Sequence, residues 1–330
     1  MTQALTTFYK LCMRILITGG AGFIGSHLAH HFSAGRHSVM VIDDLSRGAP
    51  ANVPARAELV QMSITDPALV RVVGSFRPEA ICHHAAQVSV RRSVEDPCAD
   101  AHINVLGTIR VAEAAAQAGA HTLLFASSGG AIYGEQDAYP ASECHTRRPT
   151  SPYGVSKLSA ESYLDHFARG SGIRTVHLRY ANVYGPRQEP RGEAGAVAIF
   201  AQRMLRGEGI TIHGDGLQTR DYVYVGDVVR ANALALENTR VRGPLNIGTG
   251  IETSVVELIA ALAKVTRSPT KPAHGPARAG EQRRSVLAID RARSELDWAP
   301  QTALHEGLVL TTAWLTRQRS GRLARVTSLR

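Results

Sequence analysis

The segment Arg14–Asp43 constrains the fold of this chain most, because it places four glycines directly after a short apolar run. The run Arg14–Thr18 is rich in β-branched residues, which predicts a buried parallel strand. The spacing of the glycines fits a strand that turns sharply into a phosphate-binding helix. Without Cβ atoms the turn can approach a pyrophosphate closely, and the helix aims N–H groups and its positive dipole end at the phosphates. The four glycines are Gly19, Gly20, Gly22 and Gly25.

An acidic residue at the end of the next strand completes a dinucleotide-binding pattern. We expect a helix over Ser26–Ala34 and a second strand over Ser38–Ile42, which ends at Asp43. This position has the spacing of the acid that binds the adenosine ribose. A carboxylate there accepts from two ribose hydroxyls and repels a 2′-phosphate, which favours NAD over NADP. Arg47 lies close by and could meet such a phosphate, so NADP stays open.

Composition excludes several classes of protein. Apolar residues make up 44% of the 330 residues, and no apolar run approaches the ~18 residues of a membrane helix. Residues 1–12 have no signal-peptide pattern and are expected to be a dispensable extension. The four cysteines lack metal or disulfide spacing, which favours reduced thiols and a cytoplasmic location. They are Cys12, Cys82, Cys98 and Cys144.

The net charge of +9 is concentrated at the C-terminus. Residues 317–330 contain five arginines and no acid, and we expect them to form a disordered, solvated tail. Aromatic residues are only 5% of the chain, and no basic stripe is interleaved with them. The sequence therefore predicts no nucleic-acid partner and no membrane partner.

Strands and helices alternate through about residue 180, which predicts a Rossmann-like doubly wound parallel sheet. Beyond Asn182 the pattern breaks into short strands and a helix over Ala196–Arg206, which predicts a smaller, discontinuous α+β substrate domain. We expect an NAD-binding domain over 1–182, with a return at about 223–250, and a substrate domain mainly over 183–316. The further expected strands are Glu58–Met62, Ala80–His84, Thr122–Ala126 and Thr175–Arg179, and the further expected helices are Asp66–Phe76 capped by Asp66, Asp100–Gly119 and Tyr153–Ala168.

Tyr153 and Lys157 lie four residues apart near the start of an expected helix, so both side chains share one face. A tyrosine has a pKa of ~10, and lowering it by ~3 units needs about 4 kcal/mol of differential stabilisation. A neighbouring ammonium and a positive nicotinamide ring, shielded from water, are suited to supply it. Alone the pair could be a chance spacing. After a complete NAD pattern, it predicts a catalytic base.

Seven motifs together give the chain a specific resemblance, from Met13 to about Thr316. It resembles the extended short-chain dehydrogenases/reductases, in particular the nucleotide-sugar branch typified by UDP-glucose 4-epimerase. The motifs are TGGAGFIG (Thr18–Gly25), HHAAQVSV (His83–Val90), SSGGAIYGE (Ser127–Glu135), SPYGVSK (Ser151–Lys157), RYANVYGPR (Arg179–Arg187), RDYVYVGDV (Arg220–Val228) and LNIGTG (Leu245–Gly250).

The resemblance implies NAD-dependent epimerisation at C4 of a UDP-hexose through a 4-keto intermediate, as in galactose metabolism, by a homodimer that pairs through Asp100–Gly119 and Tyr153–Ala168. It implies that Tyr153 is the base, that Lys157 tunes it, and that a Ser or Thr assists. That Ser/Thr position is Gly129 here, so the role is assigned to Ser128. The implied substrate-binding residues are Ser128, Asn182, Arg220, Arg278, Glu281 and Ser285. The implied cofactor-binding residues are Gly19, Gly22, Phe23, Ile24, Gly25, Asp43, Asp44, Ser46, Arg47, Ser63, Ile64, Ala85, Ala86, Gln87, Asn104, Tyr153 and Lys157.

Three departures from the family pattern bear on substrate and reaction. Ser63 stands where an aspartate usually contacts adenine. Ser285 aligns with a bulky aromatic residue near the sugar C2 substituent, so a small side chain there leaves room for UDP-GlcNAc and UDP-GalNAc. Ala131 replaces the acid that dehydratases and decarboxylases carry, which argues against elimination.

Other readings stay open. The nearest alternatives are a UDP-glucuronate 4-epimerase or decarboxylase, and a non-catalytic NAD-sensing regulator on the same fold. His27, His30 and His31 have helical spacing suited to a metal, but no Cys or carboxylate accompanies them, so no metal is predicted. His83 and His84 are expected to pack at the end of a strand.

Overall fold

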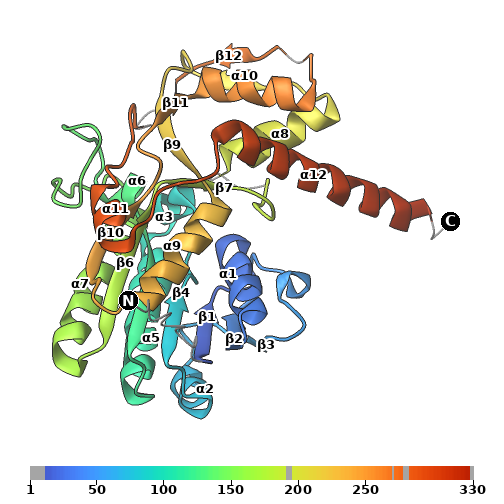
Figure 1. The fold of residues 1–330 in the computed structure, drawn as a ribbon. Helices are drawn as coiled ribbons and strands as arrows, with labels where there is room; N and C mark the ends of the chain where they lie inside the picture. Colours follow the sequence, from blue (N-terminus) through green and yellow to red (C-terminus); the bar gives the residue numbers. More distant parts are fainter. Residues whose placement is uncertain (1–11, 191–194, 270, 278–281, 328–330) are drawn as a thin grey trace, which may run out of the picture.

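A computed structural model describes residues 12–190, 195–269, 271–277 and 282–327, with side chains described to residue 319. Its main element is a parallel sheet of seven strands, in the order β10-β6-β5-β4-β1-β2-β3 (Figure 1). The neighbours of β1 are β2 and β4, so the order reverses beside β1 and opens a crevice at the carboxyl ends of the strands. The strands are β1 (Arg14–Thr18), β2 (Ser38–Asp43), β3 (Glu58–Gln61), β4 (Ala80–His83), β5 (Thr122–Ser128), β6 (Arg174–Tyr180) and β10 (Gly243–Ile247).

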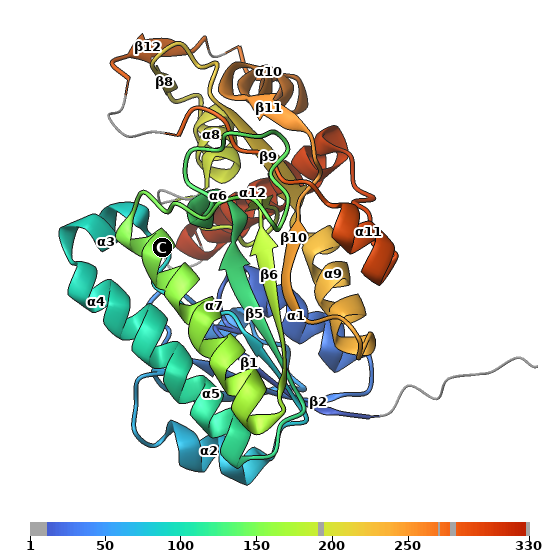
Figure 2. The ribbon, with the colours of Figure 1, turned by 90° about the vertical axis from the view of Figure 1, so that its left-hand side faces the viewer.

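Helices cover both faces of this sheet, as Figures 1 and 2 show. On one face α1 (Phe23–Ala34) and α9 (Val225–Glu237) pack in a core that includes Leu28 and Val228. On the other face α2 (Leu69–Phe76), α5 (Gly107–Gln117) and α7 (Pro152–Ser171) contribute Leu69, Val111 and Leu164 to a second core. The expected doubly wound α/β fold is confirmed.

Some boundaries differ from the sequence-based expectation. Helix α1 begins at Phe23, three residues earlier than expected, because the chain enters the helix directly from Gly22. Helix α2 begins at Leu69, and Asp66 does not cap it: its carboxylate accepts from Ala68 N, two residues on, at 2.7 Å. Strand β5 extends through Ser128 because its pairing with β6 continues that far.

The expected helix Asp100–Gly119 is interrupted by a turn of π-helix. The chain forms α4 (Pro97–Ala101), the π turn η2 (His102–Leu106) and then α5. A Cβ on Gly107 would lie 2.6 Å from Ile64 Cδ1, so the packing here depends on glycine. Such π turns often mark functional positions, and this one contains Asn104. The preceding short helices are η1 (Pro50–Asn52) and α3 (Val90–Glu95), and α6 (Gly129–Ile132) follows β5.

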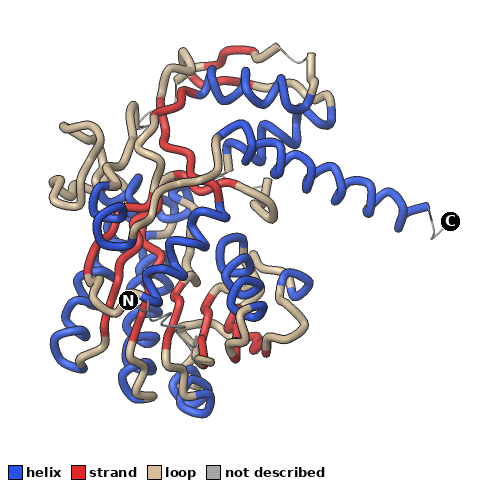
Figure 3. Tube along the Cα trace, in the orientation of Figure 1, coloured by secondary structure: helices blue, strands red, loops and turns tan. Residues whose placement is uncertain are grey.

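A smaller unit sits above the carboxyl ends of the main sheet, with its own small sheets and helices (Figure 3). The sheets are β11-β9-β7 and β12-β8, and their shared core with α8, α10 and α12 includes Tyr184, Ile212 and Leu258. Between excursions the chain re-enters the main sheet through α9 and β10. The elements are β7 (Asn182–Tyr184), α8 (Ala196–Arg206), β8 (Thr211–His213), β9 (Thr219–Tyr224), β11 (Glu252–Ser254), α10 (Val255–Thr266), β12 (Ala273–Gly275), α11 (Asp290–Leu296) and α12 (Leu304–Thr327).

The expectation of a disordered tail over 317–330 is wrong for residues 317–327, which continue α12 away from the body (Figure 1). Leu315 is buried in the small core, and Arg319 Nη1 donates to Leu205 O at 2.6 Å. This anchor, together with the good helix propensity of arginine and glutamine, outweighs the repulsion of like charges. Among the described residues, no helix combines the length and apolarity needed to cross a bilayer.

Candidate active site

The turn between β1 and α1 depends on glycine. Gly19 has a φ of +69°, and a Cβ on it would lie 2.6 Å from Ala85 N. A Cβ on Gly22 would come within 3.2 Å of Gly19 O. Gly22 is the N-cap of α1 and supplies no side-chain cap, and the first turn of α1 has no acidic residue. The first amides of α1 are therefore available to an anion in front of the helix, and the helix dipole favours one there.

Asp43 ends β2 beside this turn. Its carboxylate accepts from Ala21 N and from Leu45 N, each at 2.9 Å. Burial raises the pKa of Asp43, while these backbone hydrogen bonds oppose the rise. A carboxylate has about four lone-pair sites, so these backbone bonds leave capacity to accept from a ribose hydroxyl. The acid and the glycine turn together fit the adenosine half of a dinucleotide.

A cavity of ≈ 2310 Å³ joins this turn to the carboxyl ends of β4, β5 and β6. Because its lining combines a glycine cradle, an acid at the end of β2 and a catalytic pair, the residues present fit NAD. All but one of the predicted cofactor residues line it, and they are Gly19, Gly22, Phe23, Ile24, Gly25, Asp43, Asp44, Ser46, Arg47, Ser63, Ile64, Ala85, Ala86, Gln87, Tyr153 and Lys157.

Tyr153, Lys157 and Ser128 meet in this cavity. Ser151 caps α7 by accepting from Gly154 N at 3.2 Å, which starts the helix where Tyr153 and Lys157 share one face. The Ser128 hydroxyl hydrogen-bonds with the Tyr153 phenol. Lys157 Nζ donates to Ala126 O at 2.9 Å and lies 5.9 Å from the centre of the Tyr153 ring. A base, a hydroxyl and a cation thus converge at the end of β5.

Burial dominates the pKa values of the pair. It raises the pKa of the Tyr153 phenol to about 12, against the hydrogen bond from Ser128, and the charge of Asp100 adds to the rise. It lowers the pKa of the Lys157 ammonium to about 8, although the charges of Asp100 and Glu161 act to raise it. Among the protein's own groups, desolvation outweighs the hydrogen bond from Ser128, and the lowering of the Tyr153 pKa expected from Lys157 and the nicotinamide ring together stays a prediction. At neutral pH the protein presents a neutral phenol and a charged ammonium.

Gly129 has little room for a side chain, because Leu287 packs against it. A Cβ on Gly129 would lie 2.6 Å from Leu287 Cδ1, and both residues are buried. Ser128 instead caps α6, accepting from Ala131 N at 3.3 Å, and its hydroxyl also reaches Tyr153.

Comparison with known proteins identifies the family. Residues 15–248 match the model of the NAD dependent epimerase/dehydratase family. This chain belongs to that family. It is 46% identical over 304 residues to the UDP-glucose 4-epimerase of Mycolicibacterium smegmatis, covering 91% of this chain and 97% of the relative.

Solved structures agree with this assignment. A UDP-glucose 4-epimerase from Thermotoga maritima, solved with UDP-glucose, is 45% identical with a TM-score of 0.90, covering 93% of this chain and 99% of that one. A UDP-glucose 4-epimerase from Thermus thermophilus, in complex with NAD, is 42% identical with a TM-score of 0.88, covering 92% and 99%. The predictions of an epimerase-like extended short-chain dehydrogenase/reductase and of NAD as its cofactor are confirmed.

The predicted substrate residues are only partly brought together. Asn182 on β7 and Arg220 on β9 line the cavity. Ser285 does not line the cavity, because its side chain is buried. Its Oγ would lie 3.8 Å from a Cβ on Gly130, a residue that does line the cavity. Arg278 and Glu281 lie outside the described residues. Of the predicted substrate residues that the structure describes, Ser128, Asn182 and Arg220 therefore line the cavity, and their roles stay predictions.

Asn104 is the predicted cofactor residue that does not line the cavity. Its Oδ1 accepts from Gln87 N at 2.9 Å, and its Nδ2 donates to Gln87 O at 2.9 Å and to Asp100 Oδ1 at 3.0 Å. Gln87 Nε2 also donates to Asp100 Oδ1 at 2.8 Å. Asn104 therefore holds the backbone of the loop after β4, although it does not itself line the cavity. Gln87 belongs to that loop and lines the cavity.

Arg187 is a cavity residue that the sequence reasoning missed. It adopts a φ of +68°, lines the cavity, and its Nη1 donates to Ser26 Oγ in the first turns of α1 at 3.2 Å. Burial lowers the pKa of its guanidinium. A cation at the phosphate-binding end of α1 suits a pyrophosphate. The Gly185-Pro186 dipeptide before Arg187 could have identified it from the sequence, because this dipeptide marks a turn that can bring the chain back to the cavity.

The remaining expectations concern the departures from the family pattern. Ser63 lines the cavity, with its Oγ 2.8 Å from Thr65 Oγ1, and Ala131 lines it without an acid. His83 is buried between Thr18 and Thr108, at 2.7 and 3.0 Å, and burial lowers its pKa well below its ordinary value. Within the part of the chain that the structure describes, no cluster of His, Cys, Asp and Glu could hold a metal ion.

Proposed function

We propose that this chain interconverts the C4 epimers of a UDP-hexose, UDP-glucose and UDP-galactose, with bound NAD. The observation that carries the proposal is the contact of Tyr153 with Ser128 beside Lys157, in the cavity that also contains the glycine turn and Asp43. The named relatives support it, since those with 42–46% identity are UDP-glucose 4-epimerases.

In this proposal the chain's own residues handle the proton at the sugar. Tyr153 accepts the proton of the C4 hydroxyl, and Ser128 holds the same oxygen by a hydrogen bond. Lys157 stabilises the phenolate by its charge, and its bond to Ala126 O fixes its position. Bound NAD supplies the oxidant, which takes a hydride from C4 and returns it, and a positive ring that favours the phenolate.

Inversion requires that both faces of C4 meet the same cofactor in turn, so the 4-keto sugar must rotate while its diphosphate stays anchored. Asn182 and Arg220 line the cavity, and the proposal assigns them to that anchor. Arg278 and Glu281 are assigned to it by resemblance. Gly130 and Ala131 carry no acid at the positions where, by resemblance, dehydratases and decarboxylases have one, which argues against elimination.

Replacing Tyr153 tests the function. Purified parent and Tyr153→Phe proteins are incubated with UDP-glucose, and UDP-galactose is measured by NMR. We expect the variant to lose at least about 10³-fold in kcat while retaining NAD, because only the proton acceptor is removed. Tyr163→Phe is the control, since Tyr163 is an exposed residue of the same helix. A parent that converts neither UDP-glucose nor UDP-galactose contradicts the proposal.

A panel of UDP-sugars tests the substrate range. The proposal includes UDP-GlcNAc and UDP-GalNAc as substrates, on the ground that Ser285 is small where relatives carry an aromatic residue. Turnover of UDP-GlcNAc by the parent supports this extension, and its complete absence removes it. Conversion of UDP-glucuronate in place of UDP-glucose would point to the alternative reaction.

The cellular setting is part of the same proposal. All four cysteines are free, as suits a reducing cytoplasm, and C4 epimerisation of UDP-hexoses belongs to galactose metabolism. We also propose a homodimer. The helices α3 and α7, with the turn η2, carry exposed apolar side chains suited to a partner copy: Val90, Val94, Leu106, Val155 and Tyr163.

A further inference from the structure

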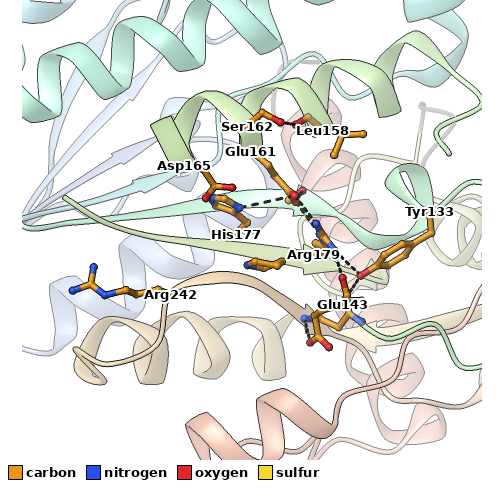
Figure 4. A network of polar contacts seen from close by, with 12 residues as sticks. Tyr133, Glu143, Leu158, Glu161, Ser162, Asp165, His177, Arg179 and Arg242 are labelled. Carbon is orange, nitrogen blue, oxygen red and sulfur yellow. Dashed lines mark hydrogen bonds and ion pairs between the residues drawn. The ribbon is translucent and has the colours of Figure 1, made fainter. Parts of the chain in front are cut away.

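Behind the catalytic groups lies a buried polar network centred on Glu161 (Figure 4). Ser127 Oγ donates to Glu161 Oε1 at 2.6 Å. Arg179 donates twice to the same carboxylate, from Nε at 2.9 Å and from Nη2 at 2.6 Å. All three residues are at least 96% buried. None of these contacts is used by the proton transfers described above.

The network joins the elements that must be aligned for the reaction. Glu161 lies four residues after Lys157 and eight after Tyr153, so it occupies the same face of α7 two turns further on. Ser127 precedes Ser128 on β5. Arg179 on β6 is the register partner of Ser127, so the arginine closes the bridge from the neighbouring strand.

Arg179 Nη1, the guanidinium nitrogen that does not contact Glu161, also has hydrogen-bond partners. Arg179 Nη1 donates to Tyr133 Oη at 2.9 Å and to Glu143 O at 3.3 Å, and Tyr133 Oη donates to Asn246 Oδ1 at 2.8 Å (Figure 4). The guanidinium therefore has little freedom to move, and the carboxylate that it binds is held on two sides. A bidentate pair of this kind fixes direction as well as distance.

The charges within the network balance. Burial raises the pKa of Glu161, but its hydrogen bonds from Arg179 and Ser127 and the neighbouring His177 outweigh burial, so the pKa lies below its ordinary value. Burial lowers the pKa of His177, although the charges of Glu161 and Asp165 oppose it. At neutral pH the carboxylate and the guanidinium neutralise each other, and His177 stays neutral.

We propose that Glu161 is a positioning residue for the epimerase reaction: through Ser127 and Arg179 it fixes the helix that carries Tyr153 and Lys157 against the strand end that carries Ser128. The inference rests on the proposed function for the roles of those three residues. A displacement of about 1 Å between reacting groups is enough to cost about 100-fold in rate. The same carboxylate also helps Lys157 to keep its proton.

The electrostatic part of this role follows from the groups around Lys157. Asp100 from α4 and Glu161 from its own helix raise its pKa, and burial lowers it. His83 and His84 from the end of β4 also lie near it, and burial keeps both neutral at neutral pH. Removing the charge of Glu161 leaves Asp100 as the remaining carboxylate, so Lys157 releases its proton at a lower pH.

Glu161→Gln is the direct test, measured on the full chain with bound NAD. We expect kcat to fall about 10- to 100-fold with KM within about twofold, because substrate anchoring is separate from the Tyr153–Ser128 alignment. The basic limb of the kcat–pH profile is expected to move to lower pH, an effect that a merely structural role would not produce. A folded variant with kcat within twofold of the parent and an unshifted profile overturns the proposal.

Asp227→Asn is the matched control. Asp227 is an equally buried carboxylate that accepts from Arg230 Nη2 at 2.8 Å, but it belongs to α9 and does not line the cavity. We expect this variant to lose stability without a change in the pH profile. If Glu161→Gln does not fold, Ser127→Ala removes one hydrogen bond and leaves both charges paired. It should lower kcat about 10-fold, and an unchanged kcat overturns the proposal.

Crystal structures separate this inference from the proposed function. A parent without epimerase activity contradicts the function and says nothing against the alignment. In that case the parent and Ser127→Ala, or Glu161→Gln, are compared directly. Movement of Tyr153 away from Ser128 in the variant supports the positioning role, and an unchanged contact overturns it.

Discussion

Leu287 occupies the space that a side chain on Gly129 would need, with its Cδ1 2.6 Å from the position of a Cβ there. Leu287 is fully buried, so it has no room to withdraw. The contact limits the space for a side chain at position 129, and the hydroxyl that interacts with Tyr153 comes from the preceding residue, Ser128.

Restoring the family's hydroxyl at position 129 is therefore expected to fail. Gly129→Ser should lower the free energy of unfolding by about 1–3 kcal/mol, because the added atoms overpack a closed site, and it should not raise kcat. Gly130→Ala is the control for stability, since a Cβ there meets Ser285 Oγ at an ordinary 3.8 Å. Urea unfolding of both variants checks the prediction. A Gly129→Ser protein as stable as the parent and faster would contradict it.

Ser128→Ala should lower kcat about 100-fold while KM changes little, because the hydroxyl contacts the proton acceptor and does not anchor the diphosphate. The loss of the α6 cap should also cost about 1 kcal/mol of stability. Steady-state kinetics with UDP-glucose measures the first effect and thermal unfolding the second. Ser162→Ala is the control, because Ser162 on α7 only donates to Leu158 O within the helix. Equal kcat in the two variants would remove Ser128 from the reaction.

Lys157→Met should abolish activity and yet stabilise the protein at neutral pH. The folded pKa of Lys157, about 8, lies below its ordinary 10.5, so the folded state resists carrying this proton. Each pKa unit corresponds to about 1.4 kcal/mol, so the lowered pKa of Lys157 reduces the stability of the parent by about 3 kcal/mol. This reduction is complete below pH 8. Between pH 8 and 10.5 the unfolded chain binds the extra proton, so the parent gains stability as pH rises.

The free energy of unfolding, measured from pH 6 to 10, tests the direction of this pH dependence. The advantage of Lys157→Met over the parent should be largest below pH 8 and shrink above it. Lys264→Met, on α10 and away from the cavity, should show no such trend. An advantage that grows with pH would mean that Lys157 is not desolvated in the folded state.

Local sequence patterns predicted the helices and strands well, but they did not predict which side chains contact one another. The helix Ala196–Arg206 was expected with its observed bounds, because an amphipathic run lies between two glycines. Glu161 and Arg179 were placed in a helix and a strand, but nothing in their spacing says that they meet. The π turn at His102–Leu106 depends on Asn104 bonding to Gln87 and on Gly107 packing against Ile64. Such contacts join segments far apart in the sequence, and periodicity does not report them.

Asn104→Ala should weaken NAD binding by distorting the loop after β4, which contains Gln87. The substitution leaves Gln87 N and O without their partners in a buried place, which costs about 1–3 kcal/mol. We expect faster NAD loss, measured by chromatography of the cofactor released from the protein, and a lower melting temperature. Asn238→Ala removes a similar amide that donates to Glu295 O at an exposed site, and should change neither. Unchanged NAD retention in Asn104→Ala would show that Gln87 holds its place without it.

The exposed apolar side chains of α3 and α7 should determine the oligomeric state. Val155 is 50% exposed on α7 and Val94 is 63% exposed on α3, and the two helices lie on the same side of the molecule (Figure 2). Val155→Asp should convert a dimer to a monomer, because a buried, unpaired carboxylate opposes association. Light scattering after size-exclusion chromatography measures the mass. Val256→Asp places the same charge at a 41% exposed valine on α10 and should leave the mass unchanged. A parent that elutes as a monomer contradicts the proposed homodimer, and a Val155→Asp protein that stays dimeric places the interface elsewhere.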